Sequence, residues 1–179
     1  MLRELDSADA GDLFVFRSDD DAQRYNDAPL REPAEAMALI ERVRAEFAAG
    51  EGVYWALAVP DDPRAIGLFG LGGWDRYHRR AEIGYNVHRD HWGQGLATEA
   101  VRGILEFAFT TMNLNRIEAL IIADNHPSVR LVERVGFVRE GTRRACSWEE
   151  DGVFHDSAIY GLLQREYQAT GVRPSPRRA

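Results

Sequence analysis

Hydrophobic and polar positions follow two different periods between Ala81 and Met112. From Ala81 to Val87, apolar residues alternate with polar or small ones, the period of two that predicts a half-buried strand. Further along, apolar residues recur every three or four positions, which predicts a helix with one buried face: Val101, Ile104, Leu105, Ala108 and Met112. The pattern therefore predicts a strand, a short turn and a helix in direct succession.

The turn between these two elements, Trp92–Ala97, contains Gly93 and Gly95. A helix that starts here leaves its first N–H groups without intrahelical partners, at the positive end of the helix dipole. The glycines allow a ligand to approach the backbone closely. We therefore expect an anion-binding site, with phosphate as the expected anion.

The N-terminal third of the chain predicts a short strand followed by helices. Asp6, Ser7 and Asp9 offer N-caps to a helix that runs through Leu13 and Arg17. A further helical turn is predicted from a capping box between Ser18 and Asp21, and a longer helix from Ala36, Ile40, Val43 and Phe47 on one face, with Gly50 as its C-terminal cap.

The rest of the chain alternates strands and helices, which predicts one α/β or α+β domain with a central mixed sheet. A near-continuous apolar run predicts a strand that is covered on both faces at Arg116–Ala123. The other predicted elements are strands at Leu2–Leu5, Val53–Val59, Ala65–Gly72, Phe137 onward and Val153–Leu163, turns at Pro60–Pro63 and at 149–152, and a helix that begins at Pro127 and ends at Gly136.

Length and composition fit one medium-sized globular domain. The chain has 179 residues, of which 45% are hydrophobic and 28% charged, and we expect a domain over residues 1–170 with a flexible basic tail at 171–179. No apolar run is long enough to span a membrane, and the N-terminus lacks the features of a signal peptide. A single cysteine, Cys146, excludes an intramolecular disulfide, so the expected location is the cytoplasm.

The formal net charge of -7 argues against general nucleic-acid binding, which needs a concentrated Lys/Arg surface. An acidic surface instead suits cationic partners such as amines and basic peptide termini. Oligomeric state stays open, and a homo-oligomer is compatible with the sequence.

The order of the motifs is more specific than the glycines alone. A strand is followed by Gly93–Ala100 at the start of a helix, then by a buried strand, then by Asn125–Ser128 and finally by Glu133–Phe137. This order, over roughly Trp55–Leu163, resembles the GNAT N-acetyltransferases, and within them the RimJ/RimL-like branch. One position departs from the general family pattern, which has Gln or Arg three residues before the middle glycine, where this chain has Trp92.

The resemblance implies a mostly antiparallel twisted sheet and acetyl-CoA as acetyl donor. The backbone amides that would hold the pyrophosphate are those of Gly93, Gln94, Gly95, Leu96, Ala97 and Thr98. The pantetheine arm would lie along the strand end at Asn86, Val87 and His88, where one amide, of Val87 or His88, would polarise the thioester carbonyl. Asn125 would contact the pantetheine amide.

Acetyl transfer also needs a base for the amine and an acid for the departing thiolate. The resemblance favours an α-amine as acceptor, such as a protein N-terminus, whose reference pKa of about 8 is easier to overcome than the 10.4 of lysine. Glu82 is either the base or an ordinary outward-facing strand carboxylate. Ser128 is either the acid or a structural residue at a helix start, and Tyr160 is a second candidate acid that packing would equally explain.

Other functions are less compatible with the residues. Cys146 has no predicted basic partner that would make it a nucleophile, and His88 with His91 lacks a third ligand for zinc. A binding module that keeps the cofactor site without turnover remains an alternative. A dinucleotide oxidoreductase with Glu118 on the ribose is weaker, because Thr98 replaces the third glycine of that motif.

Overall fold

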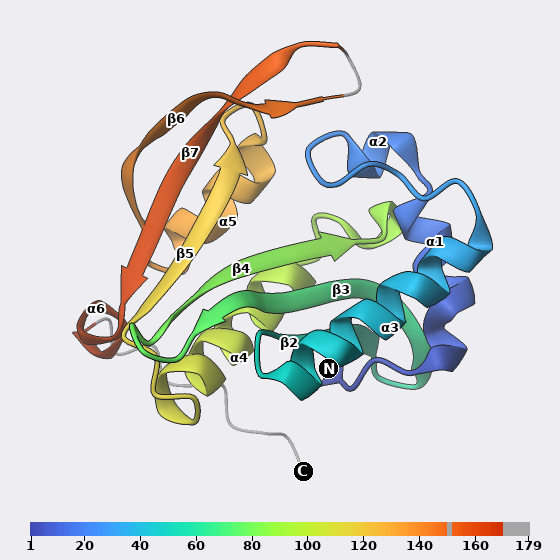
Figure 1. Ribbon diagram of the computed structural model, residues 1–179, viewed down its shortest axis with the longest axis horizontal. Helices are drawn as coiled ribbons and strands as arrows, with labels where there is room; N and C mark the ends of the chain where they lie inside the picture. Colours follow the sequence, from blue (N-terminus) through green and yellow to red (C-terminus); the bar gives the residue numbers. More distant parts are fainter. Residues whose placement is uncertain (150–151, 170–179) are drawn as a thin grey trace.

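A computed structural model describes residues 1–149 and 152–169, and Figure 1 shows the arrangement. The strands are β1 Leu2–Arg3, β2 Val53–Val59, β3 Asp62–Asp75, β4 Arg80–Val87, β5 Arg116–Ile122, β6 Val138–Trp148 and β7 Phe154–Leu163. The helices are α1 Ala10–Arg17, α2 Asp20–Gln23, α3 Pro33–Ala49, α4 Leu96–Thr110, α5 His126–Arg134 and α6 Gln164–Ala169, with short 3-10 turns η1 Ser7–Asp9 and η2 Arg89–His91. The predicted tail at 171–179 and part of the predicted turn at 149–152 lie outside the described residues.

The strands form one seven-stranded sheet in the order β1-β2-β3-β4-β5-β7-β6. Every pairing within it is antiparallel except that of β4 with β5. The predicted α/β class with a mixed, mostly antiparallel sheet is therefore confirmed. A doubly wound parallel sheet, which the oxidoreductase alternative requires, is wrong for this chain.

The sheet opens between its two middle strands. Parallel pairing of β4 with β5 covers only Arg80–Glu82 against Arg116–Glu118, after which the strands separate. β3 stays paired with β4 as far as Val87, and β7 stays paired with β5 as far as Ile122. The gap therefore has a continuous ladder on each side, and the backbone of β4 that faces it is left without a strand partner.

Each face of the sheet carries its own hydrophobic core. On one face, α4 packs its apolar stripe against β3, β4 and β5, and Val101, Leu105 and Ala108 are fully buried there. On the other face, α1 and α3 enclose a smaller core that includes Leu13, Phe16 and Ile40. The helices α1 to α3 lie on the near side of the sheet in Figure 1, and α4 lies behind it.

The N-terminal helices differ from the prediction in two details. Asp19, not Ser18, caps α2, because its side chain accepts a hydrogen bond from the Ala22 N–H at 3.2 Å, while Ser18 ends α1. Phe47 was predicted on the buried face of α3 but is 63% exposed, because it lies near the end of the helix, beyond the core. The predicted C-terminal cap at Gly50 is confirmed, with φ of 72°.

Three further elements depart from the pattern. Met112 lies beyond the end of α4, which stops at Thr110. β5 is not covered on both faces, because Leu120 and Ile122 line an open cavity. Helix α6 was not predicted, and it follows β7 directly.

Glycines on β3 and β4 make room on the cavity side of the sheet. Gly70 of β3 is paired with Gly84 of β4 and, on its other side, with Tyr54 of β2. A Cβ on Gly70 would lie 2.2 Å from Cδ1 of Tyr54, whereas a Cβ on Gly84 would meet nothing within 4 Å. The Tyr54 ring therefore lies over Gly70, an arrangement that compensates for the missing side chain.

Gly70→Ala should lower the free energy of unfolding by about 1 to 3 kcal/mol, because its methyl group would displace the Tyr54 ring. Gly84→Ala is the matched control, since the same change enters open space and should cost little. Urea denaturation of both variants measures the difference. Equal destabilisation of the two would contradict the role given to the Tyr54 ring.

Candidate functional site

The turn before α4 leaves backbone donors exposed. Gly93 and Gly95 have φ of 72° and 81°, in the left-handed region that glycine adopts without strain, and a Cβ on either would meet nothing within 4 Å. No side chain caps the helix, and the Glu99 N–H bonds back to the Gly95 carbonyl at 3.1 Å. The N–H groups of Leu96, Ala97 and Thr98 therefore have no intrahelical acceptor and are available to an anion.

The end of β4 presents a second backbone donor. The His88 N–H donates to the Ile66 carbonyl at 2.8 Å, so it faces β3 and is already used. Since successive amides of a strand alternate in direction, the Val87 N–H faces the gap towards β5. The Val87 carbonyl faces the same way and accepts from the Trp92 indole at 2.8 Å. Of the two amides predicted from the sequence, Val87 is thus the one left free by the ladder.

A hydroxyl pair closes the gap from the side of α5. Asn125 caps this helix by accepting from the Ser128 N–H at 3.2 Å, which fixes Ser128 in the first turn. The Ser128 hydroxyl lies 2.6 Å from the Tyr85 hydroxyl, which reaches across from β4. The Tyr85 ring stacks on Phe69 of β3, and burial raises the pKa of the phenol to about 12, so it stays protonated at neutral pH.

Glu82 lies on β4 at the point where the strands begin to separate. Its side chain is solvent-accessible but is set among protein atoms on the cavity wall, and this burial raises the pKa of the carboxyl above its ordinary value. Arg143 of β6 lowers that pKa in part, and Glu118, opposite Glu82 on β5, raises it. A raised pKa is expected for a carboxylate that acts as a base near neutral pH.

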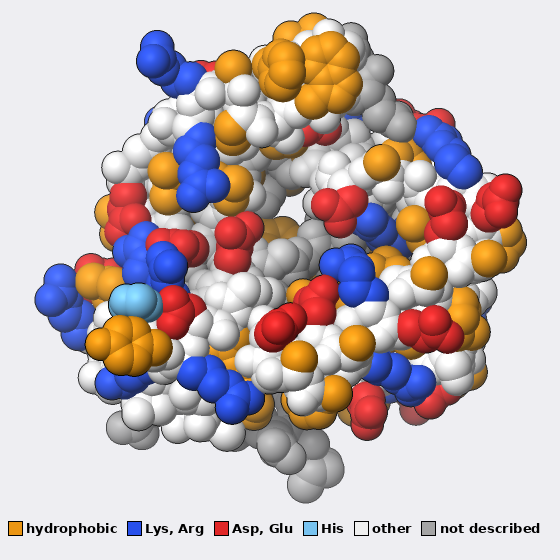
Figure 2. All heavy atoms as spheres, in the orientation of Figure 1, with side chains coloured by type: hydrophobic (Ala, Val, Ile, Leu, Met, Phe, Trp, Pro, Cys, Tyr) orange, Lys and Arg blue, Asp and Glu red, His pale blue; other side chains and the backbone are white. Residues whose placement is uncertain are grey.

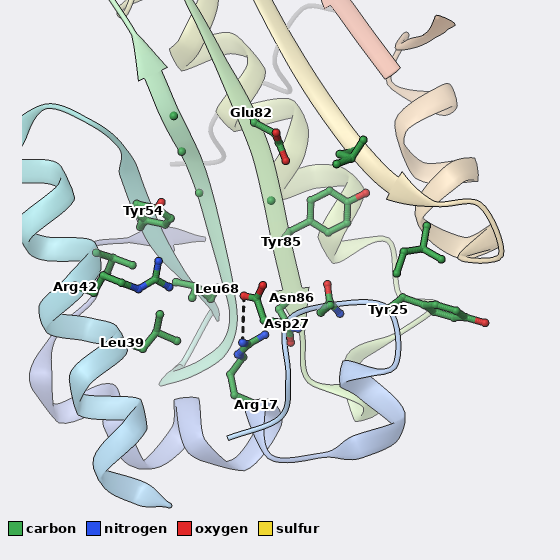
Figure 3. Close-up of a pocket in the computed structure, with 18 of the residues that line it drawn as sticks. Arg17, Tyr25, Asp27, Leu39, Arg42, Tyr54, Leu68, Glu82, Tyr85 and Asn86 are labelled. Atoms are coloured by element: carbon green, nitrogen blue, oxygen red, sulfur yellow. Dashed lines mark hydrogen bonds and ion pairs between the residues drawn. The ribbon is translucent and has the colours of Figure 1, made fainter. Parts of the chain in front are cut away.

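A cavity of about 570 Å³ occupies the α1–α3 side of the sheet, and Glu82, Gly84, Tyr85 and Asn86 of β4 contribute to its lining. Figure 2 shows the hollow near the middle of this face, with acidic and basic side chains on its rim. Figure 3 shows Arg17 and Arg42 entering it from α1 and α3, while Glu82 lies further along β4. The cavity therefore joins the gap between β4 and β5 to a charged end near the N-terminal helices.

Asn86 has a structural contact that the sequence did not reveal. Its side chain is buried and exchanges hydrogen bonds with Gln23 of α2, at 2.8 and 3.2 Å. Gln23 also donates to the Phe16 carbonyl at 2.8 Å and accepts from Arg17. This buried network ties α1 and α2 to the end of β4 and uses the Asn86 side chain, while the Asn86 backbone, which alternates with that of Val87, faces β3.

The structure brings most of the predicted site residues to one region but not Tyr160. The gap between β4 and β5 is bordered by Glu82, Val87, Ser128 and the start of α4. Tyr160 instead packs in the core with 2% exposure, and its hydroxyl donates to Glu133 at 3.0 Å, because β7 directs this side chain towards α5. Sequence reasoning missed Tyr85, whose alternation on the strand indicated only packing.

Comparison with known proteins agrees with this geometry. A family model, the acetyltransferase (GNAT) domain, matches residues 1–138. This chain belongs to the GNAT acetyltransferases. It is also 34% identical to the N-acetyltransferase p20 of Bacillus licheniformis, over 93% of both chains. The family predicted from the sequence is thus confirmed, and this GNAT acetyltransferase uses acetyl-CoA as its acetyl donor.

Solved structures share the fold. Spermidine N-acetyltransferase from Vibrio cholerae, in complex with CoA and spermine, superposes with a TM-score of 0.84 at 24% identity, over 94% of this chain and 97% of that one. RimJ from Mycobacterium smegmatis, in complex with CoA-disulfide, gives a TM-score of 0.80 at 24% identity, over 95% and 88%. At these identities, the two structures show that this chain shares their fold.

The residues present fit acetyl-CoA. The uncapped start of α4 offers N–H groups to a pyrophosphate, and the open positions at Gly93 and Gly95 leave space beside them. The unpaired edge of β4 leaves one donor, the Val87 N–H, for the thioester carbonyl at the end of an extended arm.

Within residues 1–149 and 152–169, no helix is long and apolar enough to cross a membrane.

Gly95→Asp should weaken acetyl-CoA binding more than tenfold, because the carboxylate repels a pyrophosphate, and a side chain at φ of 81° should also lower the fold stability modestly. Gly95→Asn is the matched control: both residues tolerate the left-handed backbone better than other side chains, and only the charge differs. Calorimetric titration with acetyl-CoA measures both. Equal affinities of the Asp and Asn variants would contradict an anion site at this turn.

Proposed function

We propose that this GNAT acetyltransferase transfers the acetyl group directly to an α-amine, such as a protein N-terminus, within a ternary complex. The observation that carries the proposal is that Glu82 and Tyr85 line one cavity at the open edge of β4, and that the Tyr85 hydroxyl contacts Ser128. A base and an acid thus flank the same gap. Acetyl-CoA supplies an activated acetyl group as a thioester.

Glu82 acts as the base, directly or through one water. It would accept a proton from the amine as the new bond forms, and its raised pKa brings it closer to that of the amine than an ordinary carboxylate. An α-amine with a pKa of about 8 suits such a base better than a lysine with a pKa of about 10.4. This difference favours N-terminal over side-chain acceptors.

Ser128 acts as the acid, and Tyr85 supports it. A phenol with a pKa of about 12 stays protonated at neutral pH and can donate to the Ser128 oxygen, and this direction would leave the serine proton free for the departing thiolate. The Val87 N–H is the donor that would polarise the thioester carbonyl. The chain then needs no covalent intermediate of its own.

The test of this function is CoA release from acetyl-CoA in the presence of N-terminal peptides, lysine peptides and small amines. Peptides with a free α-amine should give the highest kcat/KM, and initial rates with both substrates varied should give intersecting lines. Parallel lines would indicate an acetylated enzyme and would contradict direct transfer. Acetyl-CoA binding without CoA release for any amine would favour a binding module.

Glu82→Gln should lower kcat/KM about a hundredfold at neutral pH, the usual scale for loss of a base, and should remove the acidic limb of the pH profile. The free energy of unfolding of the Glu82→Gln variant should not be lower than that of the unchanged protein. Because the folded-state pKa of Glu82 is raised, the stability that this carboxyl contributes is present below its unfolded pKa and lost as the pH rises through the folded value. Rates and thermal unfolding of the variant at several pH values check both points.

Glu118→Gln gives an internal control for this assignment. Its charge raises the pKa of Glu82, so its removal should shift the acidic limb of the pH profile to lower pH while activity at high pH is retained. An unmoved limb would show that a group other than Glu82 titrates there.

Ser128→Ala should lower kcat by about a hundredfold, and Tyr85→Phe by less, because the phenol only supports the acid. Tyr160→Phe is the matched control, since it removes the same hydroxyl from a tyrosine that does not line the cavity. Steady-state kcat for the three variants decides the assignment. A larger loss in Tyr160→Phe than in Tyr85→Phe would reverse it.

A further inference from the structure

The charged end of the cavity contains an arginine whose hydrogen bonds are incomplete. Arg17, at the end of α1, is 6% exposed and lines the cavity. One guanidinium nitrogen donates to Gln23, and the other reaches Asp27 at 3.4 Å. Its Nε is the one buried side-chain nitrogen or oxygen without a hydrogen-bond partner among the residues that the structure describes.

The unused side of Arg17 is the side that binds carboxylates. A guanidinium grips a carboxylate with two parallel N–H groups, and one such pair consists of Nε and a terminal nitrogen. Here Nε is unpaired, and the terminal nitrogen Nη2 makes only the long contact with Asp27, whose side chain is 85% exposed. A buried charge that is held this weakly is costly, because its desolvation is not repaid.

A second guanidinium strengthens the positive character of this end. Arg42 of α3 lines the same cavity, and its charge lowers the pKa of Arg17 further after the larger effect of burial. Figure 3 shows Arg17, Arg42 and Asp27 directed towards one another. Arg42 is paired with Glu46 at 3.1 Å on the rim, so the weakly occupied position is the one beside Arg17.

The charges along the cavity are therefore separated. Among the described residues, the cationic lining side chains, Arg17 and Arg42, come from the N-terminal helices. Gln23 connects Arg17 to Asn86 of β4, and Glu82 lies four residues from Asn86 along the same strand. Four residues of strand span about 13 Å, the length of three to four extended residues. An acceptor of that length could place its amine near Glu82 and an anionic group near Arg17.

We propose that Arg17, with Arg42, binds a carboxylate on the acceptor, so that the substrate class is an α-amine with a carboxylate a few residues away. In the free protein, the Asp27 carboxylate occupies this position beside Arg17, and it moves away when the acceptor binds. The carboxylate is either the C-terminus of a short peptide or an acidic side chain near the N-terminus of a longer chain. This inference rests on the proposed function, of which it specifies the acceptor.

Two pairs of peptides test the inference and distinguish the sources. The first pair is Ala-Ala-Ala-Ala with a free C-terminus or a C-terminal amide, and the second is Ala-Ala-Glu-Ala-amide or Ala-Ala-Gln-Ala-amide. In at least one pair, the carboxylate peptide should have a kcat/KM about tenfold to a hundredfold higher, the range for a charge-assisted hydrogen bond. Equal values within both pairs, or a preference for spermidine over all four peptides, would overturn the proposal.

Variants show whether the preference depends on this end of the cavity. Arg17→Gln and Arg42→Gln should reduce the ratio within the preferred pair, whereas Arg44→Gln, which removes an arginine paired with Asp6, should leave it unchanged. Asp27→Asn should raise the ratio, because it removes the resident carboxylate. An arginine with only a structural role predicts equal losses for all peptides in Arg17→Gln and no gain in Asp27→Asn, and that result would contradict the proposal.

Binding measurements separate a failure of this inference from a failure of the proposed function. If no peptide or amine releases CoA, the proposed function fails, and calorimetric titration of the same peptide pairs in the presence of CoA still tests the carboxylate site. Tighter binding of a carboxylate peptide that is lost in Arg17→Gln supports the site. Equal binding within both pairs contradicts it.

Discussion

The early end of the β4–β5 pairing is the constraint on which the site depends. Three residue pairs hold the two halves of the sheet together, and beyond Glu82 the strands separate while their outer partners continue. A complete ladder would have used the Val87 amide and filled the space that Tyr85 crosses to reach Ser128. The binding edge, the hydroxyl pair and the entrance to the cavity are thus consequences of one interrupted strand pairing.

The open gap needs support from elsewhere in the fold, and buried polar contacts supply it. Gln23 fastens α2 to Asn86 at the free end of β4, and Asn125 holds the first turn of α5 where Ser128 faces the gap. A satisfied buried network is rigid, which keeps the two sides of the gap in position. Arg17 belongs to the same network, but its partners do not satisfy it. The same cluster therefore contains the structural contact between Gln23 and Asn86 and an Arg17 guanidinium that can still bind an anion.

Local patterns in the sequence predicted the elements well, and contacts between distant residues were harder to predict. The alternation from Ala81 to Val87 and the glycines before α4 act within a few residues, so the strand, the turn and the helix followed from them. Whether β5 had an open face depended on where β4 separated from it, and the spacing of apolar residues within one strand does not predict that position. Tyr85 looked like packing for the same reason, since its partner lies 43 residues away.

The separation of β4 from β5 predicts which backbone amides acetyl-CoA covers, and amide hydrogen exchange measured by NMR tests this directly. Saturating acetyl-CoA should slow exchange at Val87 and at Leu96 to Thr98, where the free protein has donors without strand or helix partners. His88, already bonded to Ile66, should change little. Protection at His88 without protection at Val87, or no change at the start of α4, would contradict a cofactor site formed by the separation of β4 from β5.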